Sequence, residues 1–228
     1  MDSSNKAIVL CGGLGTRLRA VVKDVPKPMA PIGNKPFLSF VLEYLQKQDI
    51  KEVVLAVSYK YEVIQEYFKD SFLNMDIKYS IEKNPLGTGG AIKQALSLMN
   101  SDCFVLNGDT FFDINLKNMT LDNSKICIAL KKMLDFDRYG CINFNDNFLI
   151  TSFEEKKFHK EGFINGGIYL VSKDIFKDFK LEDNFSFEDF LQANFKLLNA
   201  KAKPFDDYFI DIGIPKDYNN FKEYVTQL

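Results

Sequence analysis

Histidine and arginine are scarce in this sequence of 228 residues. There is one histidine, His159, and three of the 29 basic residues are arginines: Arg17, Arg19 and Arg138. A single histidine excludes metal sites that need several histidine ligands, and Ser-His-Asp or Cys-His chemistry would depend on that one residue. Because a guanidinium can bind an anion through two parallel hydrogen bonds, the two arginines at 17 and 19 mark their segment as a candidate binding site.

Cysteines and long apolar stretches are also few. The cysteines lie far apart and form no Cys-x-x-Cys pair: Cys11, Cys103, Cys127 and Cys141. The sequence shows no signal peptide and no apolar stretch long enough to cross a bilayer. We therefore expect free thiols, a reducing cytoplasmic setting and no membrane partner.

The charges are nearly balanced, with 29 basic and 31 acidic residues and a formal net charge of −2. This balance argues against nucleic-acid binding, which needs a surplus of cations on one face. No linker, repeat or low-complexity tract divides the chain. We therefore expect a single domain, 1–228, with a nucleotide-binding half over 1–112 and a second half over 113–228.

Hydrophobic periodicity predicts an α/β fold. In the first half, strands are expected at 7–10, 53–57, 77–81 and 103–106, alternating with helices at 37–48, 61–68 and 90–99. In the second half, strands are expected at 126–130, 141–144, 148–150 and 164–171, with a hairpin turn at 145–147 and helices at 187–198 and 215–226. The pattern predicts a Rossmann-like layered fold: a mainly parallel, mixed central sheet flanked by helices, plus a small antiparallel element in the C-terminal half.

A glycine-rich segment follows the first predicted strand. It runs from Leu10 through Gly12, Gly13, Gly15 and Thr16 to the arginines. Glycines at this place allow close approach of the backbone to a ligand, and successive N–H groups can form a cradle for an anion. The segment matches neither a P-loop nor a dinucleotide fingerprint, and a tight turn without a ligand is the alternative interpretation.

Two prolines bracket one lysine shortly after this segment. Pro26 and Pro28 restrict the backbone on both sides of Lys27, and we expect Pro28 to hold the lysine extended. An ordinary solvated lysine needs no such restriction. We therefore predict that Arg17 and Lys27 lie against phosphate groups.

Residues 12–18, followed by the Pro-Lys-Pro segment 26–28, resemble the signature of the sugar-1-phosphate nucleotidyltransferases. The resemblance extends from residue 7 to the last predicted helix. It implies an enzyme that converts an NTP and a sugar 1-phosphate into an NDP-sugar and pyrophosphate. It also implies catalytic roles for Arg17 and Lys27, and a nucleotide-binding role for the members of the glycine-rich segment: Leu10, Gly12, Gly13, Gly15 and Thr16.

Two aspartates are candidates for a metal site. Asp109 follows a predicted strand in an Asn107-Gly108-Asp109 segment, where Mg²⁺ could bind, although such dipeptides also form ordinary turns. Asp211 interrupts an apolar strand, which is costly unless the carboxylate is paired or binds a metal. The resemblance implies that Asp109 and Asp211 hold Mg²⁺, with Asn107 and Gly108 on the side of the sugar phosphate.

The segment 86–91 is a loop and helix start, and Thr88 is a candidate N-cap. In the family resembled, this stretch and a polar residue upstream lie on the nucleobase, which implies nucleotide-binding roles for Glu82, Gly87 and Thr88. An ionised carboxylate only accepts hydrogen bonds, and guanine offers two adjacent donors. Glu82 therefore favours GTP, unless it is simply solvated.

Three further elements match the sugar side of the family, so the half over 113–228 is expected to bind the sugar phosphate. Lys156 is implied to meet the phosphate, although Lys157 is an alternative. Asn165 and Gly166 match a motif that contacts sugar hydroxyls; two glycines at a strand start otherwise indicate a bulge. Glu188 matches an acidic element of the family at a helix start. Acidic residues in the first turn of a helix also stabilise that helix, so its position has an explanation without a ligand.

Within the family, segments 33–38, 85–91 and 107–114 are most similar to the guanylyltransferases of D-glycero-D-manno-heptose 1-phosphate. The resemblance implies formation of GDP-heptose from GTP for cell-surface polysaccharides, and it allows for a homodimer. Alternatives are another sugar 1-phosphate such as mannose or glucose, another base, a cytidylyltransferase, or a non-catalytic regulatory homologue. A regulatory homologue should have lost some of Arg17, Lys27, Asp109 and Asp211, and all four are present.

Overall fold

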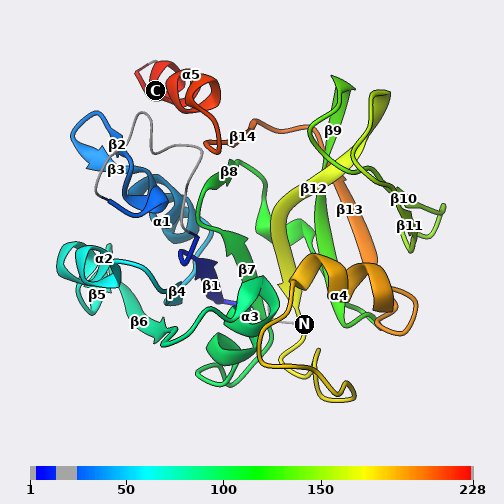
Figure 1. The fold of residues 1–228 in the computed structure, drawn as a ribbon, viewed down its shortest axis with the longest axis horizontal. Coiled ribbons are helices and arrows are strands. Elements are labelled where there is room, and N and C mark those ends of the chain that lie inside the picture. The colour runs from blue at the N-terminus through cyan, green and yellow to red at the C-terminus, as the bar shows by residue number, and fades with distance from the viewer. Residues whose placement is uncertain (1–3, 14–24, 227–228) are drawn as a thin grey trace.

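The computed structural model describes residues 4–13 and 25–226. Its main feature is an eight-stranded sheet through the centre of the protein (Figure 1). From one edge to the other, the strands are β13 (Lys201–Phe205), β9 (Ile126–Phe136), β12 (His159–Val171), β7 (Cys103–Asn107), β1 (Lys6–Leu10), β4 (Glu52–Val57), β6 (Met75–Ile81) and β5 (Ser71–Phe72).

The pairing of these strands confirms the predicted mixed, mainly parallel sheet. β1 pairs in parallel with both β4 and β7, β4 with β6, and β13 with β9. β12 is antiparallel to both β7 and β9, and β5 is antiparallel to β6. The alternating strand–helix pattern of the first half thus forms the parallel side of the sheet, as expected.

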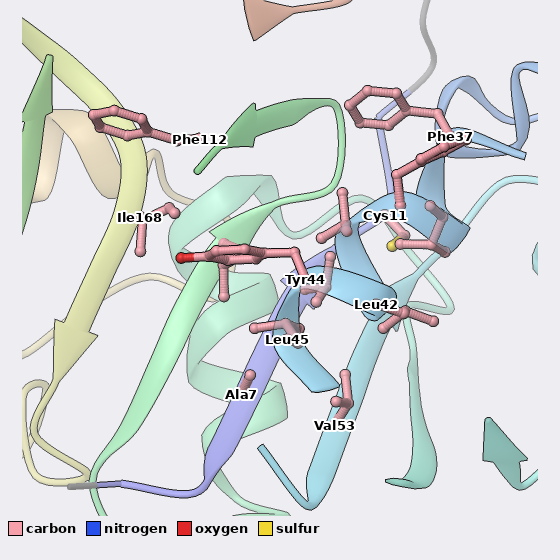
Figure 2. Packing of buried hydrophobic residues seen from close by; sticks show 14 of the residues in the cluster. Ala7, Cys11, Phe37, Leu42, Tyr44, Leu45, Val53, Phe112 and Ile168 are labelled. Carbon is pink, nitrogen blue, oxygen red and sulfur yellow. The ribbon is translucent and has the colours of Figure 1, made fainter. Parts of the chain in front are cut away.

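Helices cover both faces of the sheet. α1 (Phe37–Lys47), α2 (Tyr61–Phe68) and α5 (Pro215–Val225) pack on one face, and α3 (Gly87–Leu96) and α4 (Phe187–Asn194) on the other. Side chains alternate along a strand, so Ala7 and Val9 belong to one core cluster while Ile8 belongs to the other. Figure 2 shows the first cluster, in which Leu42 and Leu45 of α1 lie over Ala7 and Val53 of the sheet.

Three small antiparallel sheets complete the described structure. β10 (Ile142–Phe144) pairs with β11 (Ile150–Phe153), β8 (Thr110–Phe112) with β14 (Phe209–Asp211), and β2 (Pro31–Ile32) with β3 (Lys35–Pro36). Two short 3₁₀ helices, η2 (Lys27–Met29) and η3 (Leu116–Asn118), lie in the connections. The predicted turn at 145–147 is confirmed: the Asn145 side chain accepts hydrogen bonds from the backbone N–H groups of Asn147 and Leu149.

The second half departs from the predicted strand bounds. β9 continues past residue 130 to Phe136, and β12 begins at His159 rather than at 164, so the two strands form a longer antiparallel pair. Charged side chains occupy this extension, and Lys132 forms an ion pair with Glu161. The extension was not predicted because its sequence contains no continuous apolar run. β13 was not predicted, because Lys201 and Lys203 interrupt its apolar residues.

Candidate active site

Two adjoining cavities lie at the carboxyl ends of inner strands of the central sheet. The first, of about 650 Å³, is lined by Leu10 and Asn107, the last residues of β1 and β7, and by Ala56 near the end of β4. The second, of about 400 Å³, adjoins the first, and Asn107 and Glu188 line both cavities. Parallel α/β sheets bind their ligands at the carboxyl ends of the strands, so these cavities are the candidate site.

Most of the predicted site residues line one of the two cavities. In the first lie Leu10, Gly12, Gly13, Lys27, Glu82, Gly87, Thr88, Asn107, Asp109 and Glu188. In the second lie Asn107, Lys156, Asn165, Glu188 and Asp211. Gly15, Thr16 and Arg17 fall outside the described residues. The structure therefore brings together segments from both halves of the sequence.

Gly108 and Gly166 line neither cavity, and the surrounding backbone explains them instead. The Gly108 N–H donates to the Leu10 carbonyl at 2.9 Å, and a Cβ there would lie 2.5 Å from that oxygen. A Cβ on Gly166 would lie 2.5 Å from the Phe112 ring and 2.8 Å from the Ala129 carbonyl oxygen. Both glycines are thus required by close packing next to the site.

Lys27 joins the two predicted metal-binding aspartates. Its Nζ donates to Asp109 Oδ2 at 2.5 Å and lies 3.5 Å from Asp211 Oδ1. The lysine side chain is only 12% exposed, so its ammonium is held between the carboxylates rather than in solvent. One cation between two anions leaves a net negative charge at the border of the two cavities.

The pairing of β8 with β14 brings these aspartates together. Asp211 lies opposite Thr110, the residue after Asp109, and the Ile212 N–H donates to the Asp109 carbonyl at 3.0 Å. The Gly213 N–H donates to Asp211 Oδ1 at 2.7 Å, which orients that carboxylate. The two carboxylates meet only because this non-local strand pair forms.

The electrostatics at this point suit a divalent cation. Burial, and then the negative charge of Asp109, raise the pKa of the Asp211 carboxyl, while Lys27 and the Gly213 amide lower it. An added cation would relieve that repulsion. In the described part of the chain, no group of three or more Cys, His, Asp or Glu side chains could hold a metal alone. Mg²⁺ accepts one or two carboxylates plus phosphate and water oxygens, so the two aspartates fit its requirements.

The backbone around Lys27 differs from the predicted extended segment. Lys27 is the first residue of η2, which closes through hydrogen bonds from Met29 N–H to the Pro26 carbonyl and from Ala30 N–H to the Lys27 carbonyl. The first turn of a helix tolerates proline, because N–H groups there have no partner within the helix. The prolines thus favour a tight turn that directs the lysine into the site.

Glu82 also lines the first cavity, directly after β6. Its Oε2 accepts a hydrogen bond from the Leu86 N–H at 3.1 Å. Its Oε1 faces Gly12, where a Cβ would lie only 2.7 Å from that oxygen. Burial raises the pKa of this carboxyl, and the Leu86 bond partly opposes the shift. The carboxylate is therefore held in place rather than simply solvated.

The structure distinguishes the two candidate lysines of the second cavity. Lys156 lines that cavity, whereas Lys157 forms an ion pair with Glu154 at 2.8 Å. Asn165 uses both ends of its amide within the protein. Its Oδ1 accepts from the Gly167 N–H at 3.0 Å and its Nδ2 donates to the Tyr169 hydroxyl at 2.7 Å.

Tyr139 and Arg138 were missed as residues of this region. Tyr139 lines the second cavity, and burial, followed by the charge of Asp211, raises its pKa to about 12. Arg138 donates to Asp217 in the first turn of α5 at 2.8 Å. The rarity of arginine was a signal for Arg138, but no local pattern connects residue 138 to a helix that begins at Pro215.

The sequence of the chain matches those of known proteins over nearly its whole length. The family model described as nucleotidyl transferase matches residues 6–227. The chain is similar to D-glycero-alpha-D-manno-heptose 1-phosphate guanylyltransferase of Campylobacter jejuni, with 66% identity over 95% of this chain and 98% of that protein. It is also similar to the enzyme of the same description from Aneurinibacillus thermoaerophilus, with 48% identity over 93% and 95% of the two chains.

A solved structure shows the same fold. The crystal structure of HddC from Yersinia pseudotuberculosis, complexed with GMP-PN, matches with a TM-score of 0.83 and 38% identity, over 96% of this chain and 99% of that one. Because the family model matches nearly the whole length of the chain, the chain belongs to the nucleotidyl transferase family. Its mixed central sheet and its two cavities agree with this assignment. Over the described residues, none of the helices combines the length and apolar character that a membrane span requires.

Proposed function

We propose that the protein transfers a guanylyl group from GTP to D-glycero-D-manno-heptose 1-phosphate, forming GDP-heptose and pyrophosphate. The observation that carries this proposal is the pair of adjoining cavities that share Asn107 and Glu188, with Lys27, Asp109 and Asp211 between them. Two polyanionic substrates need such neighbouring sites with positive charge at the border, which Lys27 together with a divalent cation on the two aspartates would supply. The two guanylyltransferase relatives, each matched over nearly its whole length, support the choice of GTP and heptose 1-phosphate.

In this reaction, a phosphate oxygen of the sugar 1-phosphate attacks the α-phosphorus of GTP. A new bond forms between this oxygen and the α-phosphorus. In line with it, the bond from the α-phosphorus to the oxygen shared with the β-phosphorus breaks, and its electron pair leaves with pyrophosphate. The attacking oxygen is already ionised near neutral pH, so no general base is required. Catalysis then consists of positioning and charge stabilisation.

The residues of the site divide this work. Lys27 would neutralise charge near the α-phosphate, and Arg17 would bind the triphosphate through its bidentate guanidinium. Lys156 would hold the incoming sugar phosphate, and Asn165 and Glu188 would meet sugar hydroxyls. Asp109 and Asp211 would hold Mg²⁺, which would supply positive charge that stabilises the reacting phosphate groups. The described cysteines are buried free thiols, consistent with a reducing, cytoplasmic location.

A pyrophosphate-release screen tests the proposed function. GTP, ATP, UTP, CTP and dTTP are each combined with heptose, mannose and glucose 1-phosphate in the presence of Mg²⁺. We expect the highest kcat/KM for GTP with heptose 1-phosphate, and no release without a sugar phosphate. Absence of release from that pair would refute the specific proposal, while release from another pair would assign a different substrate within the family.

Glu82 provides a test of base recognition. We expect Glu82→Gln to lower kcat/KM for GTP about tenfold, because two guanine donors lose a charged acceptor. The value for UTP should change less, so the GTP-to-UTP ratio falls. Glu66→Gln, on the exposed side of α2, is the matched control. An unchanged GTP-to-UTP ratio in Glu82→Gln would contradict this role.

A further inference from the structure

The nucleotide side and the sugar side of the site are joined by two interlocked segments. Residues 85–90, at the start of α3, lie against residues 183–188, at the start of α4 (Figure 1). The Gly89 N–H donates to the Phe185 carbonyl at 2.9 Å, and the Phe185 N–H donates to the Leu86 carbonyl at 3.0 Å. The Asn184 amide adds a bond to the Pro85 carbonyl at 2.9 Å. The two segments thus pair through their backbones.

The glycines of the first segment are explained by this contact. A Cβ on Gly90 would lie 2.2 Å from the Asp183 carbonyl oxygen, and a Cβ on Gly87 would lie 2.5 Å from the Phe185 carbonyl oxygen. Such distances are far inside van der Waals contact. Gly87, for which the family resemblance implies nucleotide binding, therefore also lets the 183–188 segment approach, and Gly90 does the same. The two segments are therefore packed backbone against backbone.

The Thr88 hydroxyl forms its hydrogen bonds with the sugar-side segment, residues 183–188. It donates to Glu188 Oε2 at 2.8 Å and accepts from the Phe187 N–H at 2.8 Å. A threonine hydroxyl has a single proton to donate, so that proton is used by Glu188 in this structure. Thr88 is the second residue of α3, on the nucleotide side, yet its partner is a carboxylate that lines both cavities.

Glu188 lines the second cavity as well as the first, and its charge acts on a buried tyrosine beside Asn165. Burial first, and then the negative charge of Glu188, raise the pKa of Tyr169. The Tyr169 hydroxyl accepts a hydrogen bond from Asn165, which also lines the second cavity. Ser186 donates to the same Oε2 atom as Thr88, at 3.3 Å. Among the described residues, none donates a hydrogen bond to Oε1, which leaves this oxygen for a hydroxyl donor of a ligand.

We propose that Thr88 is a positioning residue for sugar recognition. By holding Oε2 of Glu188, it directs Oε1 toward a hydroxyl of the sugar 1-phosphate in the second cavity. The helix start that flanks the nucleotide thereby orders a group that recognises the other substrate. This inference rests on the proposed function, because it requires a sugar phosphate in the second cavity.

A double-mutant cycle tests the proposal. KM and kcat for heptose 1-phosphate are measured at saturating GTP, and the Kd of GTP is measured by calorimetry, for Thr88→Val, Thr88→Ser, Glu188→Gln and the Val–Gln double variant. We expect Thr88→Val to raise the sugar KM about tenfold, the cost of losing a hydrogen bond to a charged group. Thr88→Ser should restore it, and the double variant should be no worse than Glu188→Gln. The Kd of GTP should change less than the sugar KM.

Two controls separate this effect from a loss of folding. Thr120→Val removes a threonine–carboxylate bond, to Asp122 at 3.1 Å, in a turn that lines neither cavity. Thermal melting shows whether each variant is folded, and Thr88→Ala replaces Thr88→Val if valine prevents folding. Additive effects of Thr88→Val and Glu188→Gln, or a rise in the Kd of GTP with an unchanged sugar KM, would overturn the inference. Failure of the wild-type protein to use any sugar 1-phosphate would instead refute the proposed function.

Discussion

Replacing Lys27 by methionine should lower kcat about 10²-fold or more, the typical effect of removing a group that stabilises transition-state charge. Methionine keeps much of the length of the side chain and removes its charge. Among the residues that the structure describes, Lys27 is the one cation placed between Asp109 and Asp211. Its loss therefore leaves two anions facing the phosphates. The measurement is steady-state pyrophosphate release with saturating GTP, sugar 1-phosphate and Mg²⁺.

Lys35→Met is the matched control for this variant. Lys35 also follows the glycine-rich segment and forms an ion pair, with Glu43 at 2.5 Å, but it lines neither cavity. Its removal should leave kcat within about twofold, as expected for a partly exposed ion pair. Near-normal turnover of Lys27→Met would exclude a catalytic role for this lysine.

Replacing Asp211 by asparagine should have the larger effect, about 10³-fold in kcat. The amide keeps the shape of the side chain and the acceptor for the Gly213 N–H, but it removes half of the charge that would hold a divalent ion. We therefore expect the affinity for Mn²⁺, measured by electron paramagnetic resonance in the presence of GTP, to fall with the activity.

Asp206→Asn controls for the loss of a carboxylate in the same region. Asp206 is 87% exposed and pairs with Lys131 at 3.0 Å, just before β14. This variant should keep both Mn²⁺ affinity and turnover. If Asp211→Asn bound Mn²⁺ as the wild type does and turned over at a normal rate, Asp211 would have no part in a metal site.

The predicted fold was most accurate where the structure is local. The apolar spacing within 37–48 predicted a helix, and α1 covers Phe37–Lys47 between an extended Pro36 and the positive φ of Asp49. Such patterns depend on neighbours three or four residues away. The extension of β9 and β12 was not predicted, because each strand is stabilised there by its partner rather than by an apolar face of its own.

The candidate site shows the same division. The Pro-Lys-Pro segment singled out Lys27, and the interrupted apolar strand singled out Asp211. No spacing in the sequence, however, could show that Asp109 and Asp211 share one ammonium. Nor could it show that Thr88 donates to Glu188, since either residue is equally plausible as a helix cap or a ligand contact.

By itself, the sequence determined the chemical class of the protein. Its single histidine excluded metal sites with several histidine ligands and left Ser-His-Asp or Cys-His chemistry dependent on one residue. Short segments with glycine, proline and lysine marked a phosphate site, because backbone conformation depends on adjacent residues. Only the tertiary structure decided which of these groups act together. The pairing of β8 with β14 and the contact between the starts of α3 and α4 join segments far apart in the chain. Those contacts depend on the packing of the whole sheet and its helices, which no local pattern contains.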